Sequence, residues 1–321
     1  MVSISKNLRT FIAILLLSIV VGQTISFWQG DVASNIAKMK AGTYNPYREF
    51  NVWLNDIMYA HMHLNFIPNW INTLSIMDEH QKYYFTCYMR DLVAGTIVYW
   101  MTAGGWHIII YKLFRKSLFD DKNRKLPSWD VIFHQMWLAQ RSLLVYAMLP
   151  IISEILIENN LTKVYFYVEQ IGGWTNYAIC FVSYLSLVEI CIYWMHRTLH
   201  TNKWLYNNIH GPHHYYNKKE MLTPWASIAF HPIDGMLQAS PYVVCLFIIP
   251  MHYYTHMCML FFTSMWATNI HDAMWGYCEP IMGSKYHTVH HTHFVYNYGQ
   301  FFTFCDQYWG TLRVPERTKS D

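Results

Sequence analysis

Long apolar stretches separated by charged connections dominate the middle of this chain. A helix needs about 20 mostly apolar residues to cross a membrane. Three stretches have this length, with polar residues confined to the outer turns of the second: Leu92–Leu113, Trp137–Leu156 and Trp174–Met195. We therefore predict three helices that cross a membrane.

A fourth apolar stretch, Leu237–Trp266, is broken by Pro241 and by Pro250. Proline interrupts helices because it lacks a backbone N–H and its ring clashes with the preceding turn. A single crossing would place the two ends of this stretch on opposite sides of the membrane. A helical hairpin that turns at Pro250 would return the chain to its starting side, and hydropathy alone leaves both possibilities open.

The N-terminus and the charge distribution suggest an orientation. Two basic residues precede the short apolar run Phe11–Gly22, which predicts a signal peptide or signal anchor at residues 1–22. Six Lys and Arg residues lie between 112 and 125, so the positive-inside rule places this connection in the cytosol. Two further crossings would then return His196 to the cytosolic face, with the glycosylation sequon at Asn160 on the lumenal side.

Composition narrows the class of protein. Hydrophobic residues make up 53% of the 321 residues and charged residues only 13%, which excludes a disordered chain and argues against an ordinary soluble enzyme. The net charge is only +3, and no basic tract interleaves with aromatic residues, so we expect no nucleic-acid partner. The seven cysteines are scattered without a C-x-x-C pair, which favours free thiols.

Histidine is concentrated in the last part of the chain, where 13 of the 18 histidines follow residue 195. Three clusters stand out: HRTLH at 196–200, HGPHH at 210–214 and HTVHH at 287–291. Residues three or four apart share one face of a helix, so each cluster can project its imidazoles in one direction. Pro212 fits the first turn of a helix, so we expect His210 to begin one.

Three such clusters indicate a metal centre. Neutral imidazole is a good ligand for Zn, Cu, Fe and Ni. Eight imidazoles exceed the four ligands of one tetrahedral ion, so two metal ions are expected. The pattern lacks both the Glu-x-x-His pairs of soluble di-iron bundles and the facial triad of two histidines and one carboxylate. An all-imidazole pair with open positions indicates redox-active iron that reacts with oxygen.

The three clusters can meet only on one side of the membrane, which requires 237–266 to be a hairpin. His271 would then follow the second arm of the hairpin as a ninth ligand, with Asp272 as an acceptor for an imidazole N–H. Glu189 lies two turns before the first cluster and is either a functional carboxylate or a hydrogen-bonded structural one. His231 is either a metal ligand, a residue that hydrogen-bonds a ligand, or a residue with no role at the metal centre.

Further residues around the clusters carry a resemblance to a known family. They are FHPIDGMLQ at 230–238, TNIHD at 268–272, NYGQ at 297–300, Asp306 and WGTL at 309–312. With the three clusters, they resemble the fatty acid hydroxylase superfamily, and within it the sterol C5-desaturase (lathosterol oxidase) branch. The resemblance extends from about residue 177 to 315.

The resemblance implies a fold and a domain division. We expect an all-α integral membrane protein with about four transmembrane helices including hairpins, and a histidine-rich helical cap on the cytosolic face. After the N-terminal segment, residues 23–173 would form an N-terminal membrane region, 174–315 the di-iron domain and 316–321 a tail.

The resemblance also implies an activity. Members introduce a C5–C6 double bond into a Δ7-sterol at the endoplasmic reticulum, using O2, two iron ions and electrons from NAD(P)H through cytochrome b5 reductase and cytochrome b5. The iron ligands, and hence the catalytic site residues, would be His196, His200, His210, His213, His214, His271, His287, His290 and His291.

Other activities also fit these residues. C4-methyl sterol oxidation or fatty acyl hydroxylation would use the same ligands on the same scaffold. A membrane metal transporter would place histidines along a path through the membrane rather than on one face. A haem-binding protein would need only one or two axial ligands.

Overall fold

The computed structural model describes residues 31–114, 127–218, 221–272 and 279–316. The signal peptide or anchor predicted at 1–22 lies outside these ranges, as do most of the basic connection and residues 317–321 of the tail. Six of the seven cysteines lie inside them, and all six are free thiols, as predicted.

Three helical segments in the described ranges are long and apolar enough to cross a membrane. They are α5 (Glu79–His107) with its π-helical extension η1 (Ile108–Leu113), α7 (Trp129–Tyr146) with α8 (Met148–Glu158), and α9 (Trp174–Thr201). The three predicted long apolar helices are confirmed. The first begins earlier than the apolar run, because Asp78 and Gln81 form a capping box that starts α5 at Glu79.

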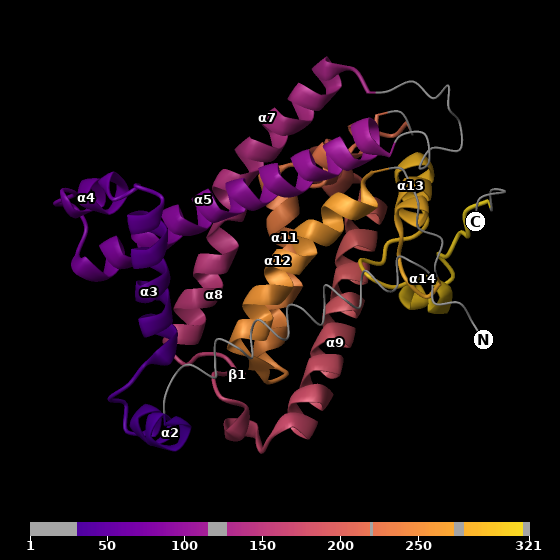
Figure 1. Ribbon diagram of the computed structural model, residues 1–321. Coiled ribbons are helices and arrows are strands. Elements are labelled where there is room, and N and C mark those ends of the chain that lie inside the picture. The colour runs from indigo at the N-terminus through magenta and orange to yellow at the C-terminus, as the bar shows by residue number, and fades with distance from the viewer. Residues whose placement is uncertain (1–30, 115–126, 219–220, 273–278, 317–321) are drawn as a thin grey trace.

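The fourth apolar stretch forms a hairpin. Its first arm is α11 (Pro232–Val244), followed by the 3-10 turn η6 (Cys245–Phe247), and its second arm is α12 (Tyr253–Ile270). At the bend, β2 (Met251–His252) pairs in parallel with β1 (Val164–Tyr165). Because α12 runs back alongside the other helices, it ends at His271 on the side where the histidine clusters lie (Figure 1).

Short helices occupy the two ends of this helical bundle (Figure 1). At the end away from the histidines lie α2, α3, α4 and η2, and at the histidine end lie α10, η3, η4, η5, α13 and α14. Their bounds are α2 (Val32–Lys40), α3 (Pro46–His61), α4 (Phe66–Asn72), η2 (Val168–Ile171), α10 (Lys203–Leu205), η3 (Tyr206–His210), η4 (His213–Tyr215), η5 (Pro224–Ala226), α13 (Ser284–His293) and α14 (Phe304–Tyr308).

The hairpin is held against α9 by buried hydroxyl groups as well as by apolar packing. The Tyr184 hydroxyl donates to the backbone carbonyl of Tyr242 at 2.7 Å, and Thr263 donates to the Tyr242 hydroxyl at 2.8 Å. His256 contacts Ser153 and Tyr184, so its polar ring is satisfied inside the core. A buried polar group costs little when it is hydrogen-bonded, and these contacts fix α9, α11 and α12 relative to one another.

A buried ionic cluster joins the membrane helices at the end away from the histidines. Arg90 of α5 is 1% exposed and pairs with Asp91 at 2.8 Å and with Glu154 of α8. Its guanidinium also donates to the side chains of Asn51 and Asn55 of α3. Charged groups within a membrane helix require such partners, so α3, α5 and α8 form one unit.

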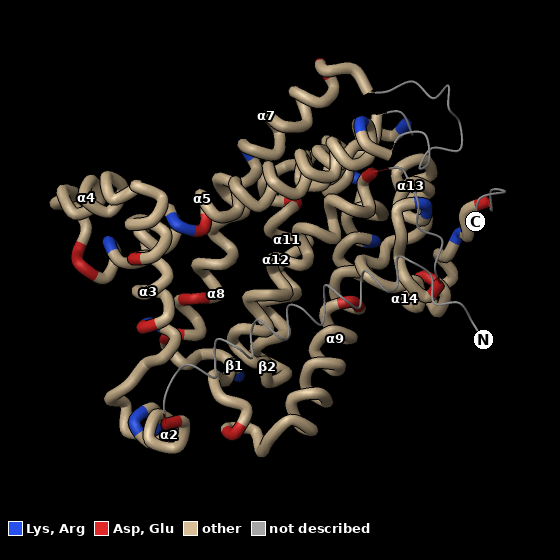
Figure 2. Tube along the Cα trace, in the orientation of Figure 1, with Lys and Arg blue, Asp and Glu red and all other residues tan. Residues whose placement is uncertain are grey.

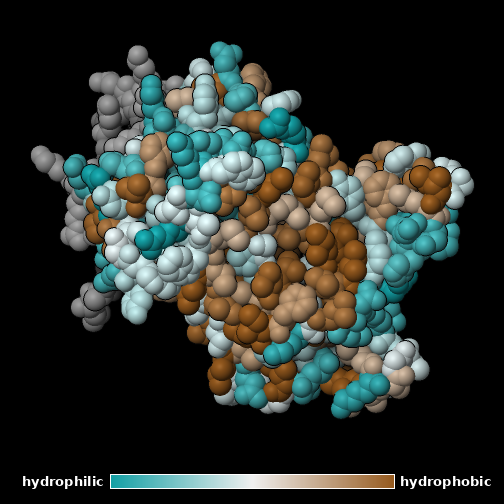
Figure 3. Space-filling model, turned by 180° about the vertical axis from the view of Figure 1, so that it is seen from behind, coloured by the Kyte–Doolittle hydropathy of each residue, from teal (hydrophilic) through white to brown (hydrophobic). Residues whose placement is uncertain are grey.

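The outer surface has the distribution that a bilayer requires. Charged residues are sparse along the middle of the long helices (Figure 2), and a broad apolar area covers the back of the molecule (Figure 3). On α9, the exposed Trp174 and Trp194 are 20 residues apart, or about 30 Å along a helix, which matches the hydrocarbon thickness. Tryptophan favours the membrane–water boundary, so we expect a boundary near Trp194, just before the histidines.

Candidate metal centre

Helices present the first and third histidine clusters, as predicted. His196 and His200 lie one turn apart in the last two turns of α9, just beyond Trp194. His287, His290 and His291 lie on α13, which is ten residues long and carries all three imidazoles inward. The predicted helical spacing is therefore confirmed for both clusters.

The second cluster is built differently from the prediction. His210 ends the π-helical segment η3 and does not begin a helix, whereas His213 and His214 lie in the separate 3-10 turn η4. Between them, the Gly211 N–H donates to the carbonyl of Tyr206, and a Cβ at Gly211 would approach that oxygen to 2.9 Å. Only glycine fits this close backbone approach. The contact closes the π-helical turn, so His210 ends a helical segment, and the prediction that it begins one is wrong.

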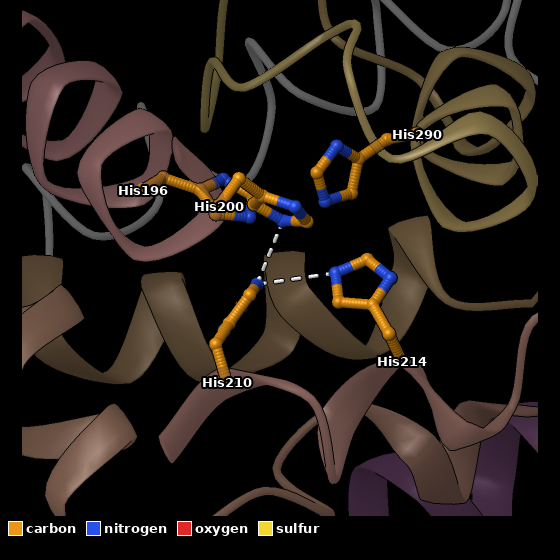
Figure 4. A group of neighbouring side chains, drawn as sticks. All are labelled: His196, His200, His210, His214 and His290. Carbon is orange, nitrogen blue, oxygen red and sulfur yellow. Dashed lines mark hydrogen bonds between the residues drawn. The ribbon is translucent and has the colours of Figure 1, made fainter. Parts of the chain in front are cut away.

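All nine histidines converge in two neighbouring groups, each with ligand nitrogens within 4.8 Å of one another. The first group contains five imidazoles and is drawn in Figure 4, and the second contains four. Their members are His196, His200, His210, His214 and His290 in the first group, and His213, His271, His287 and His291 in the second.

Consecutive histidines enter different groups. His213 joins the second group and His214 the first, while His290 joins the first and His291 the second. The ring centroids of His214 and His291 are 4.5 Å apart across the boundary. The repeated H-x-x-H-H spacing therefore interleaves two sets of imidazoles and holds them side by side.

The spacing of the nitrogens fits metal ligation. In the first group, Nε2 of His210 lies 2.9 Å from Nε2 of His200 and 3.1 Å from that of His214. In the second, Nε2 of His271 lies 3.2 Å from that of His213 and 3.0 Å from that of His287. Two nitrogens that bind one metal ion at about 2.1 Å and at right angles to each other would be about 3 Å apart.

Backbone carbonyls and a carboxylate set the tautomer of four imidazoles. These oxygens can only accept, so Nδ1–H of each ring donates and Nε2 keeps its lone pair for the centre. The acceptors are the carboxylate of Asp234 for His210 and the carbonyls of Tyr298, Tyr296 and Ala267 for His196, His290 and His271. Nε2 of His196 and of His290 is buried without a hydrogen-bond partner, which a bound metal would supply.

The electrostatic environment favours the neutral form of six of the imidazoles. Burial, together with repulsion between neighbouring imidazoles, lowers the pKa of His213, His214, His287, His290 and His291 well below the ordinary value. Burial lowers the pKa of His271 to about 4. Metal binding requires deprotonated ligands, so these shifts favour it.

Two buried carboxylates shape the loop that supports the histidines. Glu189 accepts the backbone N–H groups of Gln300, Phe301 and Phe302 at 3.0–3.2 Å. Asp306 accepts those of Tyr298 and Gly299 at 2.8 and 2.9 Å. The loop therefore presents the Tyr296 and Tyr298 carbonyls to His290 and His196, and Glu189 is a hydrogen-bonded structural carboxylate.

The remaining candidates lie beside the centre rather than in it. His231 is the N-cap of α11, where its Nδ1 accepts from the N–H of Ile233 at 3.3 Å. Asp272 accepts a hydrogen bond from the Trp106 indole at 3.2 Å, which ties the end of α5 to the end of α12. Its predicted imidazole partner stays a prediction.

Asp234 is the main residue that sequence reasoning did not assign. It lies in the first turn of α11 and is fully buried, and it also accepts from Gln238 at 2.9 Å. The motif FHPIDG contains it, but only the fold brings this helix start against His210, 24 residues away. The supporting roles of Asp306 and of the Tyr296 and Tyr298 carbonyls could not be predicted either. They depend on how the loop folds, which the residue types do not specify.

The fold and the site define a class: a helical membrane protein with a histidine-lined metal-binding centre at one end of its bundle. Residues 181–311 match the model of the fatty acid hydroxylase family. The chain is 40% identical over 228 residues to the Δ7-sterol-C5(6)-desaturase of Nicotiana tabacum, covering 71% of this chain and 83% of that protein.

Two further relatives agree. A putative Δ7-sterol-C5(6)-desaturase of Arabidopsis thaliana is 39% identical over 240 residues, covering 74% of this chain and 84% of that protein. Lathosterol oxidase of Mus musculus is 37% identical over 176 residues, covering 52% and 56%. No solved structure matches. The chain belongs to the fatty acid hydroxylase family, within its sterol C5-desaturase branch, and is an oxidoreductase of this type.

Proposed function

We propose that this protein is a Δ7-sterol C5(6)-desaturase that holds two iron ions. The observation that carries the proposal is the interleaving of nine imidazoles, eight of them buried, into two groups at one end of the helical bundle. The printed names of the relatives supply the substrate class, since the tobacco relative is a Δ7-sterol-C5(6)-desaturase.

The donor set favours iron that reacts with O2. Five imidazoles exceed a tetrahedral zinc site, and neither group contains a thiolate that would favour copper(I) or zinc. A bound iron pair would supply the oxidising power to break unactivated C–H bonds. The chain contributes the orientation of nine imidazoles, the Nδ1 hydrogen bonds that fix four of them, and a largely buried environment that limits water.

The substrate would approach from the bilayer. A narrow cavity is lined by His196, His213, His271 and His287 and continues between Phe230 and α12. The overall reaction would remove one hydrogen from each of C5 and C6 and form the double bond. One O2 would be reduced to two water molecules with two electrons and two protons, the electrons passing from NAD(P)H through cytochrome b5 reductase and cytochrome b5.

The position of the basic connection supports a cytosolic orientation of the centre. In the sequence, the basic residues at 112–125 follow the C-terminal end of α5. Trp106, at this end of α5, contacts Asp272 beside the histidines. By the positive-inside rule, this end of the bundle faces the cytosol. We place the protein in the endoplasmic reticulum membrane, where electrons from cytosolic NAD(P)H would reach this face through cytochrome b5 reductase and cytochrome b5.

The convergence of the histidines also weighs against the alternatives. A transporter would distribute them along a path through the membrane, whereas here all nine lie together at one end. A haem protein needs one or two axial ligands rather than two groups of imidazoles. C4-methyl sterol oxidation and fatty acyl hydroxylation would use the same ligands, and analysis of the product distinguishes them from C5 desaturation.

Sterol profiling in cells that lack their own sterol C5-desaturase tests the function. Expression of the chain should convert accumulated Δ7-sterols into Δ5,7-sterols. His213→Ala and His290→Ala should abolish this conversion although the protein still inserts into the membrane. His293→Ala is the matched control on α13, because His293 is exposed and lies outside both groups. Oxidation at C4, hydroxylated fatty acids, or full activity of either ligand variant would contradict the proposal.

A further inference from the structure

One face of α12 lines two adjoining cavities. The inner cavity lies against the histidines and is lined on α12 by Thr263, Ser264, Ala267 and Ile270, and just beyond the helix by His271. The outer cavity is lined on the same helix by Met257, Leu260, Phe261 and Ser264. These positions recur every three or four residues, so they form a single track along the helix.

The two cavities share a boundary. Tyr146, Ile228 and Ser264 contribute to both linings, so these side chains lie between the two cavities. The volumes are about 70 Å³ for the inner and about 100 Å³ for the outer cavity. Both are smaller than the roughly 300–1,000 Å³ of a typical ligand pocket, so the side chains that line them must move apart to admit a sterol.

The linings differ in polarity. The inner cavity carries Ser227, Gln238, Thr263 and Gln300 in addition to the histidines. The outer cavity is apolar except for the shared Tyr146 and Ser264 and for Asp91, whose Oδ1 is paired with Arg90. The track is therefore polar and metal-binding at one end and suited to an alkyl chain at the other.

We propose that the outer cavity binds the alkyl side chain at C17 of the sterol and selects sterols by its size, an assignment that rests on the proposed function. C5 and C6 lie at the end of the sterol that carries the 3-hydroxyl. If these carbons face the histidines, the hydroxyl lies among the polar groups of the inner cavity, and the C17 side chain at the opposite end points into the outer cavity.

The length of the track fits this orientation. Met257 and His271 are 14 residues apart, or about 21 Å along α12. A sterol spans roughly one leaflet, about half of the roughly 30 Å hydrocarbon core. Phe261, which is 45% exposed, lines the outer cavity, where a sterol in the bilayer can enter from the side.

Gly95 offers a way to fill the outer cavity. It lies on α5 in the cavity wall, and a Cβ there would meet only Leu143 at 3.5 Å, an ordinary contact. Gly95→Leu should therefore be accommodated in the helix while its side chain occupies the space assigned to the sterol side chain. Gly105→Leu is the matched control, because Gly105 is on the same helix and faces open space.

The test compares two Δ7-sterols, one with a full C17 side chain and one truncated at C17, in membranes that contain the electron-transfer partners. Gly95→Leu should lower kcat/KM for the full-length sterol at least tenfold relative to the truncated one, and Gly105→Leu should leave the ratio within twofold. An equal loss with both sterols, or an unchanged ratio in Gly95→Leu, would overturn the assignment. Failure of the unchanged chain to desaturate either sterol would overturn the proposed function, and this assignment with it.

A second variant acts in the opposite direction, in case Gly95→Leu does not insert. Leu260→Ala enlarges the outer cavity. It should raise kcat/KM several-fold for Δ7-sterols with an added alkyl group at C24, relative to unbranched ones. An unchanged preference would overturn the assignment.

Discussion

The carboxylate of Asp234 accepts a hydrogen bond from Nδ1 of His210 at 2.8 Å, and both side chains are completely buried. A carboxylate can only accept, so the proton resides on Nδ1 and the Nε2 lone pair faces the first histidine group. Carboxylate–histidine pairs of this kind orient metal ligands and raise their basicity. The start of α11 thus acts on the metal centre through one side chain.

Replacing Asp234 should therefore weaken metal binding without removing a ligand. Asp234→Asn keeps the size of the side chain but removes its charge and one of its acceptor oxygens. We expect iron affinity to fall about 10- to 100-fold. Iron retained by the purified protein after dialysis against graded chelator concentrations measures this. Asp56→Asn, an exposed site at the other end of the molecule, is the control, and equal iron retention in both variants would contradict the role of Asp234.

The loop held by Glu189 gives a second prediction. Glu189→Gln leaves an amide N–H₂ facing backbone N–H groups that the carboxylate now satisfies. Hydrogen bonds to a charged group contribute about 1.5–3 kcal/mol each, so the free energy of unfolding should fall by about 2 kcal/mol or more. Thermal unfolding in detergent measures the change.

Exposed Glu169→Gln on η2 is the control for that variant. Because the same loop presents the Tyr298 carbonyl to His196, the Glu189 variant should also retain less iron. A variant that keeps both its stability and its iron would show that the loop is held by other contacts.

The sequence predicted which histidines come together, but not the carboxylates that position them. The convergence of the nine histidines could be predicted because closely spaced imidazole clusters are uncommon, and the structure brings all nine into two neighbouring groups. Their role as iron ligands stays a prediction. The hairpin followed from the need to bring His271 to the same side. Asp234 and Asp306 could not be assigned, since a single carboxylate in a helix start or loop has no periodicity, and only tertiary contact gives it a partner.

The second cluster shows why a local rule failed. Pro212 is compatible with a first helical turn, and it does precede the short turn at His213. The chain before it, however, forms a π-helical segment that ends at His210, closed by the contact between Gly211 and the Tyr206 carbonyl. This places His210 in one group and His213 in the other, a division that residue spacing alone does not specify.

The orientation of the bundle can be tested with epitope tags at two exposed positions beside the histidines, Tyr215 and Val295, and at Leu161 near the opposite end. The hairpin returns the chain to its starting side, so the tags at 215 and 295 should report the same compartment, the cytosol. The tag at 161 should report the lumen. Protection from protease in sealed membranes measures this, and opposite compartments for 215 and 295 would refute the arrangement.

The metal content of the purified chain tests the central claim, that two groups of imidazoles hold a pair of iron ions. Elemental analysis of protein purified without chelators should give about two irons per chain. His213→Ala, which removes one of the four ligands of the second group, should reduce this to about one. Zinc alone, a haem spectrum, or iron that is unaffected by this substitution would contradict the account.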